Sequence, residues 1–273
     1  MGTADSFDLA RIGAALRGTN FAGNVHHFGS VDSTNAIALR EAQAGAPSGS
    51  VYVADEQTGG RGRGGHQWHS AAGDGLYVSV LLRPKLSPGA ALWVALAAAL
   101  AGHGAIAEVT GIAPDIRWPN DLLLNGKKCG GILVETAVDA ASQSEPVLRH
   151  AVIGIGINVN HADFPAELSS IATSLRLATG ERQSREEVLL ALLPALWREI
   201  ALLEAESAAP GDSGLLDRFA RASTWVKGKA VHVEEAGGYT GVTDGLDARG
   251  FLRVRATDGS LRTVLNGGVR QLD

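Results

Sequence analysis

Residues 59–65 are the first segment of this 273-residue chain whose residue types and spacing could do chemistry. Five of these seven residues are glycine, and Arg61 and Arg63 stand between them. An arginine side chain keeps its charge, and glycine lets backbone N–H groups approach an anion closely. The segment therefore suits a phosphate or acyl-phosphate ligand, and a solvated basic turn is the alternative.

The same segment matches the dinucleotide-binding pattern G-x-G-x-x-G at residues 60–65. That kind of site needs a helix directly after the glycines, but residues 66–75 predict a loop that leads to a strand. No G-x-x-x-x-G-K-[ST] segment occurs, which excludes a P-loop. His66 and His69 have no Cys or carboxylate cluster beside them in the sequence, so we predict no metal ligands.

Asp121 and Lys128 form a second candidate pair. Between them lies Asn125-Gly126, a dipeptide favoured in tight hairpin turns, so a carboxylate and an ammonium should meet at one end of a sheet. The carboxylate could serve an amine acceptor and the ammonium an anionic acyl donor. A surface ion pair worth at most about 1 kcal/mol is the alternative. Cys129 lies among apolar residues, so we expect a buried thiol rather than a nucleophile.

The elements that must position these residues alternate between strands and helices. Ser33, Thr34 and Asn35 are N-capping residue types, and they predict the start of a helix. Hydrophobic periodicity predicts the remaining elements. Helices are expected at residues 34–44, 88–108, 185–206 and 213–223, and strands at 51–54, 76–82, 116–118, 122–124, 129–136 and 152–159.

The character of the chain changes at about residue 226. Short apolar segments at 230–233, 239–242, 251–254 and 263–265 are separated by Gly and Asp turns. This spacing predicts a small β barrel of about 50 residues. We therefore expect a mixed α/β body at residues 1–225 and a β-barrel domain at residues 226–273.

Composition limits the class of protein. The chain has 24 Lys and Arg against 29 Asp and Glu, a net charge of -5, which argues against a dedicated nucleic-acid binder. Its single Cys allows no intramolecular disulfide and favours the cytoplasm. The longest apolar run, residues 90–101, falls short of the roughly 20 residues that cross a bilayer and predicts a buried helix.

Several motifs together resemble the biotin protein ligases, the biotin–[acetyl-CoA-carboxylase] ligases, from about residue 26 to the C-terminus. In order they are DSTN at 32–35, Gln57 ahead of the glycine-arginine segment, WPND at 118–121, KCGGILVE at 128–135, GIGINVN at 154–160 and ATSL at 172–175. The resemblance implies an α+β fold, the biotin/lipoate ligase fold related to class II aminoacyl-tRNA synthetase catalytic domains. It also implies that the C-terminal barrel is SH3-like.

The resemblance further implies an activity. Biotin and ATP would form biotinyl-5′-AMP and pyrophosphate, with Mg²⁺ accompanying the nucleotide. Biotin would then pass to a lysine of a biotin carboxyl carrier protein domain. A lipoate or octanoate ligase or transferase of the same fold is the alternative, and it would be expected to lack the Gly-Arg-Gly-Arg segment. A non-catalytic ligand-binding relative is a further alternative.

Residue roles follow from the same resemblance. Lys128 would lie between the biotin carboxylate and the α-phosphate, Asp121 would orient or deprotonate the acceptor lysine, and Arg63 would close over the ligand with its loop. The biotin-binding residues would be Ser33, Thr34, Asn35, Gln57, Arg61, Gly62, Arg63, Lys128, Gly131 and Gly156. The ATP and adenylate residues would be Arg61, Arg63, Trp68, Trp118, Asn120, Lys128 and Asn158. Gly131, Gly154 and Gly156 would be glycines because a ligand lies against the backbone.

Two positions depart from the family pattern. Arg117 stands where Lys commonly precedes WPND, and His66 stands where the basic segment usually ends in another Arg. Only 32 residues precede Ser33, too few for the winged-helix DNA-binding domain that some members carry. We therefore expect a monofunctional cytoplasmic ligase, monomeric or homodimeric, with no DNA or membrane partner.

Overall fold

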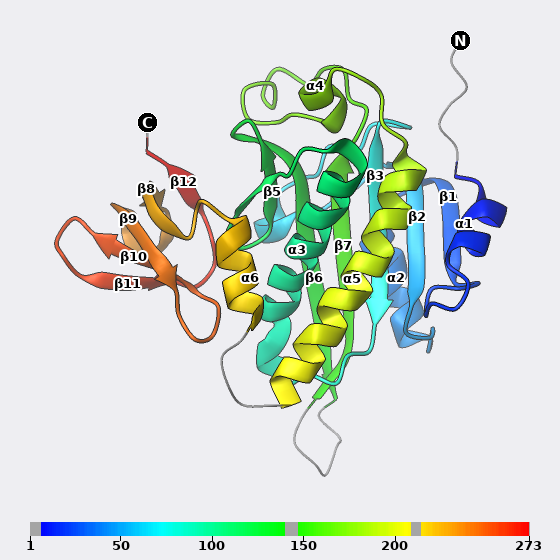
Figure 1. The fold of residues 1–273 in the computed structure, drawn as a ribbon, viewed down its shortest axis with the longest axis horizontal. Coiled ribbons are helices and arrows are strands. Elements are labelled where there is room, and N and C mark those ends of the chain that lie inside the picture. Colours follow the sequence, from blue (N-terminus) through cyan, green and yellow to red (C-terminus); the bar gives the residue numbers. More distant parts are fainter. Residues whose placement is uncertain (1–6, 140–146, 209–213, 273) are drawn as a thin grey trace.

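A computed structural model describes residues 7–139, 147–208 and 214–272. Its strands form two sheets, one of seven strands in the order β1-β2-β3-β7-β6-β5-β4 and one of five strands (Figure 1). The strands of the first sheet are β1 (Val25–Val31), β2 (Ser50–Gln57), β3 (Gly75–Leu82), β4 (Asp115–Arg117), β5 (Asp121–Leu124), β6 (Lys127–Asp139) and β7 (Val147–Asn158). All neighbours in this sheet are antiparallel except β1 and β2.

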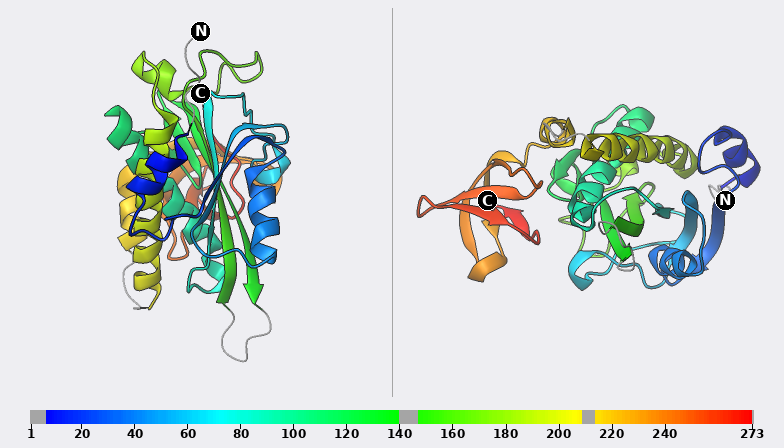
Figure 2. Two further views of the ribbon diagram at one scale, coloured as in Figure 1. Left: turned by 90° about the vertical axis from the view of Figure 1, so that its right-hand side faces the viewer. Right: turned by 90° about the horizontal axis from the view of Figure 1, so that it is seen from below.

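Helices cover both faces of the seven-stranded sheet. The helices are α1 (Leu9–Ala15), α2 (Thr34–Gln43), α3 (Ala91–Thr110), α4 (Leu175–Thr179), α5 (Arg185–Ala208) and α6 (Gly214–Ala222). Figure 2 shows α3 and α5 side by side on one face of the sheet and α2 alone on the opposite face. The loop that joins β2 to β3 therefore has room to fold over the face that α2 only partly covers.

Helix α3 is the core helix that the apolar run predicts. Leu96, Ala97, Ala98 and Ala99 are fully buried against α5 and the sheet. By length and composition the segment Pro88–Thr110 could also cross a membrane, but 56% of its most apolar window is buried inside the fold. Its apolar character is therefore explained by packing.

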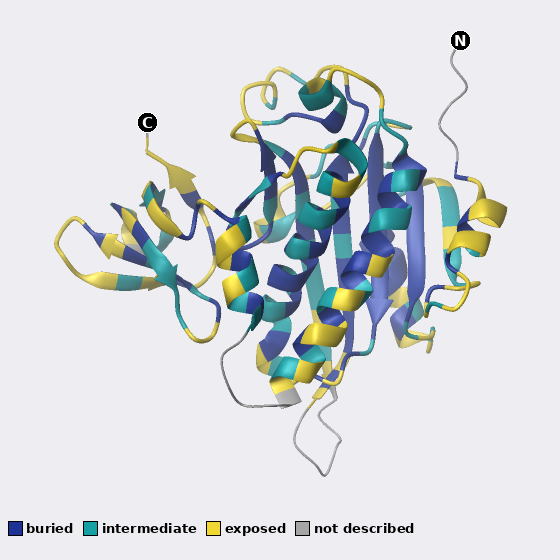
Figure 3. Cartoon of the chain, viewed as in Figure 1, coloured by how far each residue is buried: buried dark blue, intermediate teal, exposed yellow. Residues whose placement is uncertain are grey.

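The five-stranded sheet confirms the small β domain expected at the C-terminal end. It contains β8 (Lys227–Val233), β9 (Tyr239–Leu246), β10 (Leu252–Ala256), β11 (Leu261–Val264) and β12 (Val269–Gln271), in the antiparallel order β11-β10-β9-β8-β12. Buried residues of this domain, among them Val231, Leu252 and Val254, belong to the same apolar cluster as α3. Figure 3 shows buried segments in both parts of the fold. The division between residues 225 and 226 falls between the two sheets and stays a prediction.

Most of the predicted elements are present, with boundaries shifted by a few residues. The predicted helix at 213–223 begins outside the described residues at position 213 and otherwise corresponds to α6. The sequence does not predict β1, α1, α4 or β12. These elements are short or weakly patterned, and β1 is a half-exposed edge strand without alternation of buried and exposed residues.

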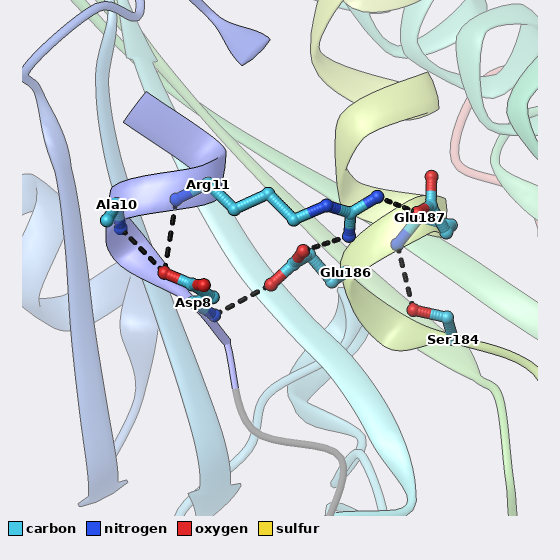
Figure 4. A network of polar contacts seen from close by, with 6 residues as sticks. All are labelled: Asp8, Ala10, Arg11, Ser184, Glu186 and Glu187. Atoms are coloured by element: carbon cyan, nitrogen blue, oxygen red, sulfur yellow. Dashed lines mark hydrogen bonds and ion pairs between the residues drawn. The ribbon is translucent and has the colours of Figure 1, made fainter. Parts of the chain in front are cut away.

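The N-terminal helix α1 is fixed to the first turn of α5 by charged side chains (Figure 4). Asp8 caps α1 by accepting bonds from the backbone N–H groups of Ala10 and Arg11 at 2.9 and 3.1 Å. The guanidinium of Arg11 pairs with Glu186 and Glu187, and Glu186 also accepts the Asp8 backbone N–H at 2.7 Å. Glu186 and Glu187 lie in the first turn of α5, where the helix dipole favours carboxylates. Their pairing with Arg11 fixes α1 to this end of α5.

The β5–β6 hairpin adopts the tight turn that its sequence predicts. Asn125 and Gly126 have φ values of 51° and 75°, the left-handed conformation that a two-residue hairpin turn of this type requires. The turn places the end of β5 opposite the start of β6, with Leu123 opposite Lys128, and a register irregularity then places Asp121 opposite Gly131. The two candidate residues are thereby placed on neighbouring strands.

Candidate functional site

A cleft lies on the α2 face of the seven-stranded sheet, under the loop that joins β2 to β3. Every residue predicted to bind biotin lines it, as do Trp68 and Asn120 from the predicted ATP set. The lining residues are Ser33, Thr34, Asn35, Gln57, Arg61, Gly62, Arg63, Trp68, Tyr77, Val78, Asn120, Lys128, Gly131, Ile132, Leu133, Gly154, Ile155 and Gly156. Residues up to 123 positions apart in the sequence therefore share one surface.

The N-terminus of α2 forms the polar wall of the cleft. Ser33 holds the N-cap position without a side-chain capping bond, and Thr34 instead donates its backbone N–H and its hydroxyl to Gln57 Oε1 at 2.9 and 3.1 Å. The Ser79 hydroxyl donates to Asn35 Oδ1 at 2.5 Å and lies 2.8 Å from Thr34 Oγ1, and Asn35 donates to Glu135 Oε2 at 2.8 Å. These side chains present donors and acceptors in fixed orientations, as recognition of a polar ring requires.

Glycines 131, 154 and 156 lie close to side chains of the protein itself. Gly131 and Gly156 are direct partners across β6 and β7, and a Cβ on Gly156 would lie 2.6 Å from the indole of Trp68. A Cβ on Gly154 would lie 2.2 Å from Asn35 Oδ1. These side chains approach the backbone closely, and the expectation that a ligand also lies against it stays a prediction.

The glycine-arginine loop has a defined fold over the cleft. The Gly62 N–H donates to His66 O at 2.7 Å, the Trp68 N–H donates to Gly60 O at 2.9 Å, and a single 3₁₀ turn covers Arg63–Gly65. Residues 66–74 form an irregular segment with a turn before β3, so no helix follows the glycines in this described part of the chain. The predicted loop that leads to a strand is confirmed.

Arg63 connects the loop to two other parts of the chain. Its guanidinium donates to Asn120 Oδ1 and to the backbone carbonyl of Asn266, both at 3.3 Å. Asn120 in turn donates to Ile132 O on β6 at 2.6 Å. The loop is therefore tied both to the sheet and to the β11–β12 turn of the small domain.

Lys128 and Asp121 form the ion pair that the hairpin predicts. Lys128 Nζ lies 2.5 Å from Asp121 Oδ1, and the ammonium also lies over the Trp68 ring, 5.4 Å from its centroid. The Asp121 side chain is only 15% exposed, so this is not a solvated surface pair. Burial raises the pKa of Asp121, but the cations Lys128 and Arg117 outweigh it, and the pKa lies below its usual range.

The backbone at Lys128 is held by a second layer of bonds. The Lys128 N–H donates to Ile171 O, and the Thr173 N–H donates to Lys128 O. Asn158 donates its side-chain amide to Thr173 O at 3.0 Å and to Lys128 O at 3.4 Å. Asn158 therefore supports Lys128 from behind and is not among the residues that line the cleft.

Trp118 also has a partner outside the cleft. Its indole is 3% exposed and donates to the Gly250 carbonyl of the small domain at 2.9 Å. The residue thus joins the two domains and does not line the cleft. The ATP-site roles predicted for Trp118 and Asn158 stay predictions.

Sequence reasoning missed Ser79, Ser70 and Tyr77. Ser79 is fully buried at the centre of the polar wall, and Ser70 accepts the Gln57 amide at 3.1 Å. The sequence does contain a signal for Ser79, because this small polar residue interrupts the apolar strand segment 78–82. A polar side chain in such a strand needs a partner on the face it points to.

The buried-thiol prediction for Cys129 is confirmed. The thiol has no exposed surface and donates to Leu122 O at 3.3 Å, and burial raises its pKa to about 12. A thiol with a raised pKa stays protonated and unreactive below that pH. We expect the folded protein to resist iodoacetamide at about pH 8, and the urea-unfolded chain to be alkylated at one site. Stoichiometric labelling of the folded protein, measured by mass spectrometry, would contradict this burial.

The comparisons with known proteins agree with this geometry. Residues 28–158 match the Biotin/lipoate A/B protein ligase family. The chain is 36% identical over 234 residues to the biotin–[acetyl-CoA-carboxylase] ligase of Paracoccus denitrificans, and the match covers 84% of this chain and 92% of that protein. The chain belongs to the biotin protein ligase family.

Other biotin protein ligases resemble the chain over different spans. The structure titled biotin protein ligase from Aquifex aeolicus in complex with biotin and ATP superposes with a TM-score of 0.76 and 30% identity, covering 92% of this chain and 100% of that chain. The bifunctional ligase/repressor BirA of Bacillus subtilis (strain 168) is 45% identical over 165 residues, which are 60% of this chain and 49% of BirA. The match thus spans about half the length of that relative.

Proposed function

We propose that the chain is an ATP-dependent biotin protein ligase that forms biotinyl-5′-AMP and then transfers biotin to a lysine of a biotin carboxyl carrier protein domain. The observation that carries the proposal is the partly buried Lys128–Asp121 pair, whose ammonium lines a cleft together with the polar network of α2 and the loop with Arg61 and Arg63. An acid-activating ligase needs such a cation where two anionic substrates meet. The relatives named above support the same substrates.

The first step joins biotin to the nucleotide. The biotin carboxylate attacks the α-phosphorus of ATP, a C–O–P linkage forms, the bond to the β-phosphate breaks, and pyrophosphate leaves. Lys128 offsets the repulsion between the two anions, with Arg61 and Arg63 facing the same space from the loop. We expect Mg²⁺ to enter with the phosphates of ATP, because the described residues contain no group of three or more potential metal ligands.

The second step transfers the acyl group to the acceptor. The ε-ammonium of the acceptor lysine gives a proton to Asp121, and the neutral amine attacks the acyl carbon. The bond from that carbon to the phosphate oxygen breaks, AMP leaves with the electron pair, and the second amine proton goes to solvent. Asp121 becomes a better base when Lys128 turns to the phosphate, because one of its two cationic partners is then engaged elsewhere.

Pyrophosphate release tests the proposal directly. The full chain is incubated with MgATP and biotin, or with MgATP and lipoate, without an acceptor. We expect release with biotin, and subsequent labelling of a carrier domain when one is added. Release with lipoate alone would instead assign the chain to the lipoate branch of the family. Release with neither acid would contradict acid activation altogether.

A further expectation concerns retention of the adenylate. Arg63→Gly removes both bonds that tie the loop to Asn120 and Asn266, so biotinyl-5′-AMP should escape about tenfold faster. Bystander proteins such as albumin should then be biotinylated on surface lysines, measured by streptavidin blotting. Gln67→Gly is the control, since it removes an exposed side chain from the same loop. Unchanged bystander labelling by Arg63→Gly would show that the loop does not retain the adenylate.

A further inference from the structure

Arg117 lies directly opposite Asp121 in the β4–β5 register, at the edge of the seven-stranded sheet. Its Nε and a terminal nitrogen both donate to Asp121 Oδ2, at 3.1 and 2.6 Å. Lys128 holds the other oxygen, Oδ1, at 2.5 Å. The two carboxylate oxygens thus have separate cationic partners from the two neighbouring strands.

The guanidinium of Arg117 is held on a second side by Trp225. Its central carbon lies 5.5 Å from the centroid of that ring, and Lys229 lies 5.0 Å from the same centroid. The segment before Trp225 is itself bound to β4, because Ser223 donates to Ile116 O and Thr224 donates to the Asp115 carboxylate. A planar guanidinium can lie over a ring and donate two bonds in its own plane, which an ammonium cannot do in the same way.

We propose that Arg117 is a positioning residue for the transfer step. It keeps Asp121 ionised and fixes its orientation through Oδ2, so that only Oδ1 changes its cationic partner. That partner is Lys128 before the substrates bind, and the acceptor ε-ammonium once Lys128 has turned to the acyl phosphate. The proposal rests on the proposed function and adds to it a role in one half-reaction only. It also gives a physical reason for arginine at this position.

The charges around Asp121 set the direction of the expected effect. Facing it are Arg117 from β4, Lys128 and the neutral thiol of Cys129 from β6, and Arg63 from the loop. Burial alone would raise the pKa of Asp121. When Arg117 is replaced by a neutral residue, the pKa of Asp121 rises. Asp121, the base, is then protonated over a wider acidic range. The acidic limb of the pH–rate profile for transfer therefore moves to higher pH.

The test separates the two half-reactions in the full chain. In Arg117→Gln, biotin-dependent pyrophosphate release should stay within about twofold of wild type, since Arg117 does not line the cleft. Transfer from supplied biotinyl-5′-AMP to a carrier domain should fall about 10- to 100-fold, with its acidic limb shifted to higher pH. Arg117→Lys keeps the charge and should restore the pH limb but not the full rate. Arg249→Gln, at an exposed arginine, should leave both steps and the limb unchanged.

Several outcomes would overturn the proposal. A parallel loss in both half-reactions of Arg117→Gln would show a general structural role, and an unmoved acidic limb would show that Arg117 does not act through Asp121. The position of the limb does not depend on the fraction of folded enzyme, so it decides the matter even if the variant is less stable. Failure of the wild-type chain to release pyrophosphate with biotin would refute the proposed function instead.

Discussion

Lys128→Ala should abolish biotin-dependent pyrophosphate release, with a loss of about 10³-fold or more. The substitution removes the ammonium that lies at the edge of the cleft, 2.5 Å from Asp121. Without it the biotin carboxylate and the triphosphate face each other with no fixed cation from β6 to offset their repulsion. Arg61 and Arg63 line the same space, but they extend from a loop rather than from the sheet.

The fold should survive this change, because Asp121 keeps its pairing with Arg117 and the Lys128 backbone keeps its bonds to Ile171 and Thr173. Lys127→Ala is the matched control. Lys127 is the adjacent residue of the same hairpin, but its exposed side chain donates to Ser169 O, away from Asp121. Pyrophosphate release is measured for both variants at saturating biotin and MgATP. Near-normal release by Lys128→Ala would show that its role is misassigned.

Gly154→Ala should remove most biotin affinity, by about 100-fold, and lower the free energy of unfolding by about 2 kcal/mol. The new Cβ would lie 2.2 Å from Oδ1 of Asn35. That amide cannot move aside cheaply, because Ser79 donates to its oxygen and its nitrogen donates to Glu135. The clash therefore has to displace the N-terminus of α2, which forms the polar wall of the cleft.

Two further variants separate the clash from the loss of recognition. Gly29→Ala in β1 is the control, since a Cβ there meets nothing within 4 Å. In the double variant Asn35→Ala/Gly154→Ala the clash disappears, so stability should recover while biotin affinity stays low. Calorimetric titration with biotin and urea unfolding measure the two effects. Full biotin affinity in Gly154→Ala would show that the polar wall formed by the N-terminus of α2 does not contact the ligand.

Local signals in the sequence are enough to predict that the candidate pair, Asp121 and Lys128, lies on one hairpin. The turn at Asn125 and Gly126 predicts a two-residue hairpin, which places Asp121 and Lys128 on neighbouring strands. Lys128 is opposite Leu123 in the register, so its side chain contacts Asp121 diagonally, two residues along β5. The glycine-arginine segment was likewise assigned to a loop because no helical pattern follows it. Such features depend on neighbours within about ten residues, where sequence patterns and backbone geometry are directly linked.

Other parts of the site depend on contacts between distant segments. The sequence predicts Trp118 near the nucleotide, a role that stays a prediction, but it does not predict that the Trp118 indole donates to Gly250 O, 132 residues further along the chain. The partners of Asn35 come from β3 and β6, so the sequence pattern around α2 could not identify them. In both cases a side chain suited to a ligand is used by another part of the protein, which only the tertiary structure shows.

The contact between Trp118 and Gly250 also bears on how proteins of this kind could be recombined. The turn that carries Gly250 lies against α3 and α6, where a Cβ on that glycine would come within 3.1 Å of Leu96. A chimera that joined this body to the small domain of a relative at residue 225 would therefore have to match the shape and the carbonyl of that turn. A boundary that is chosen from the sequence therefore does not have to coincide with the surface along which the buried core separates.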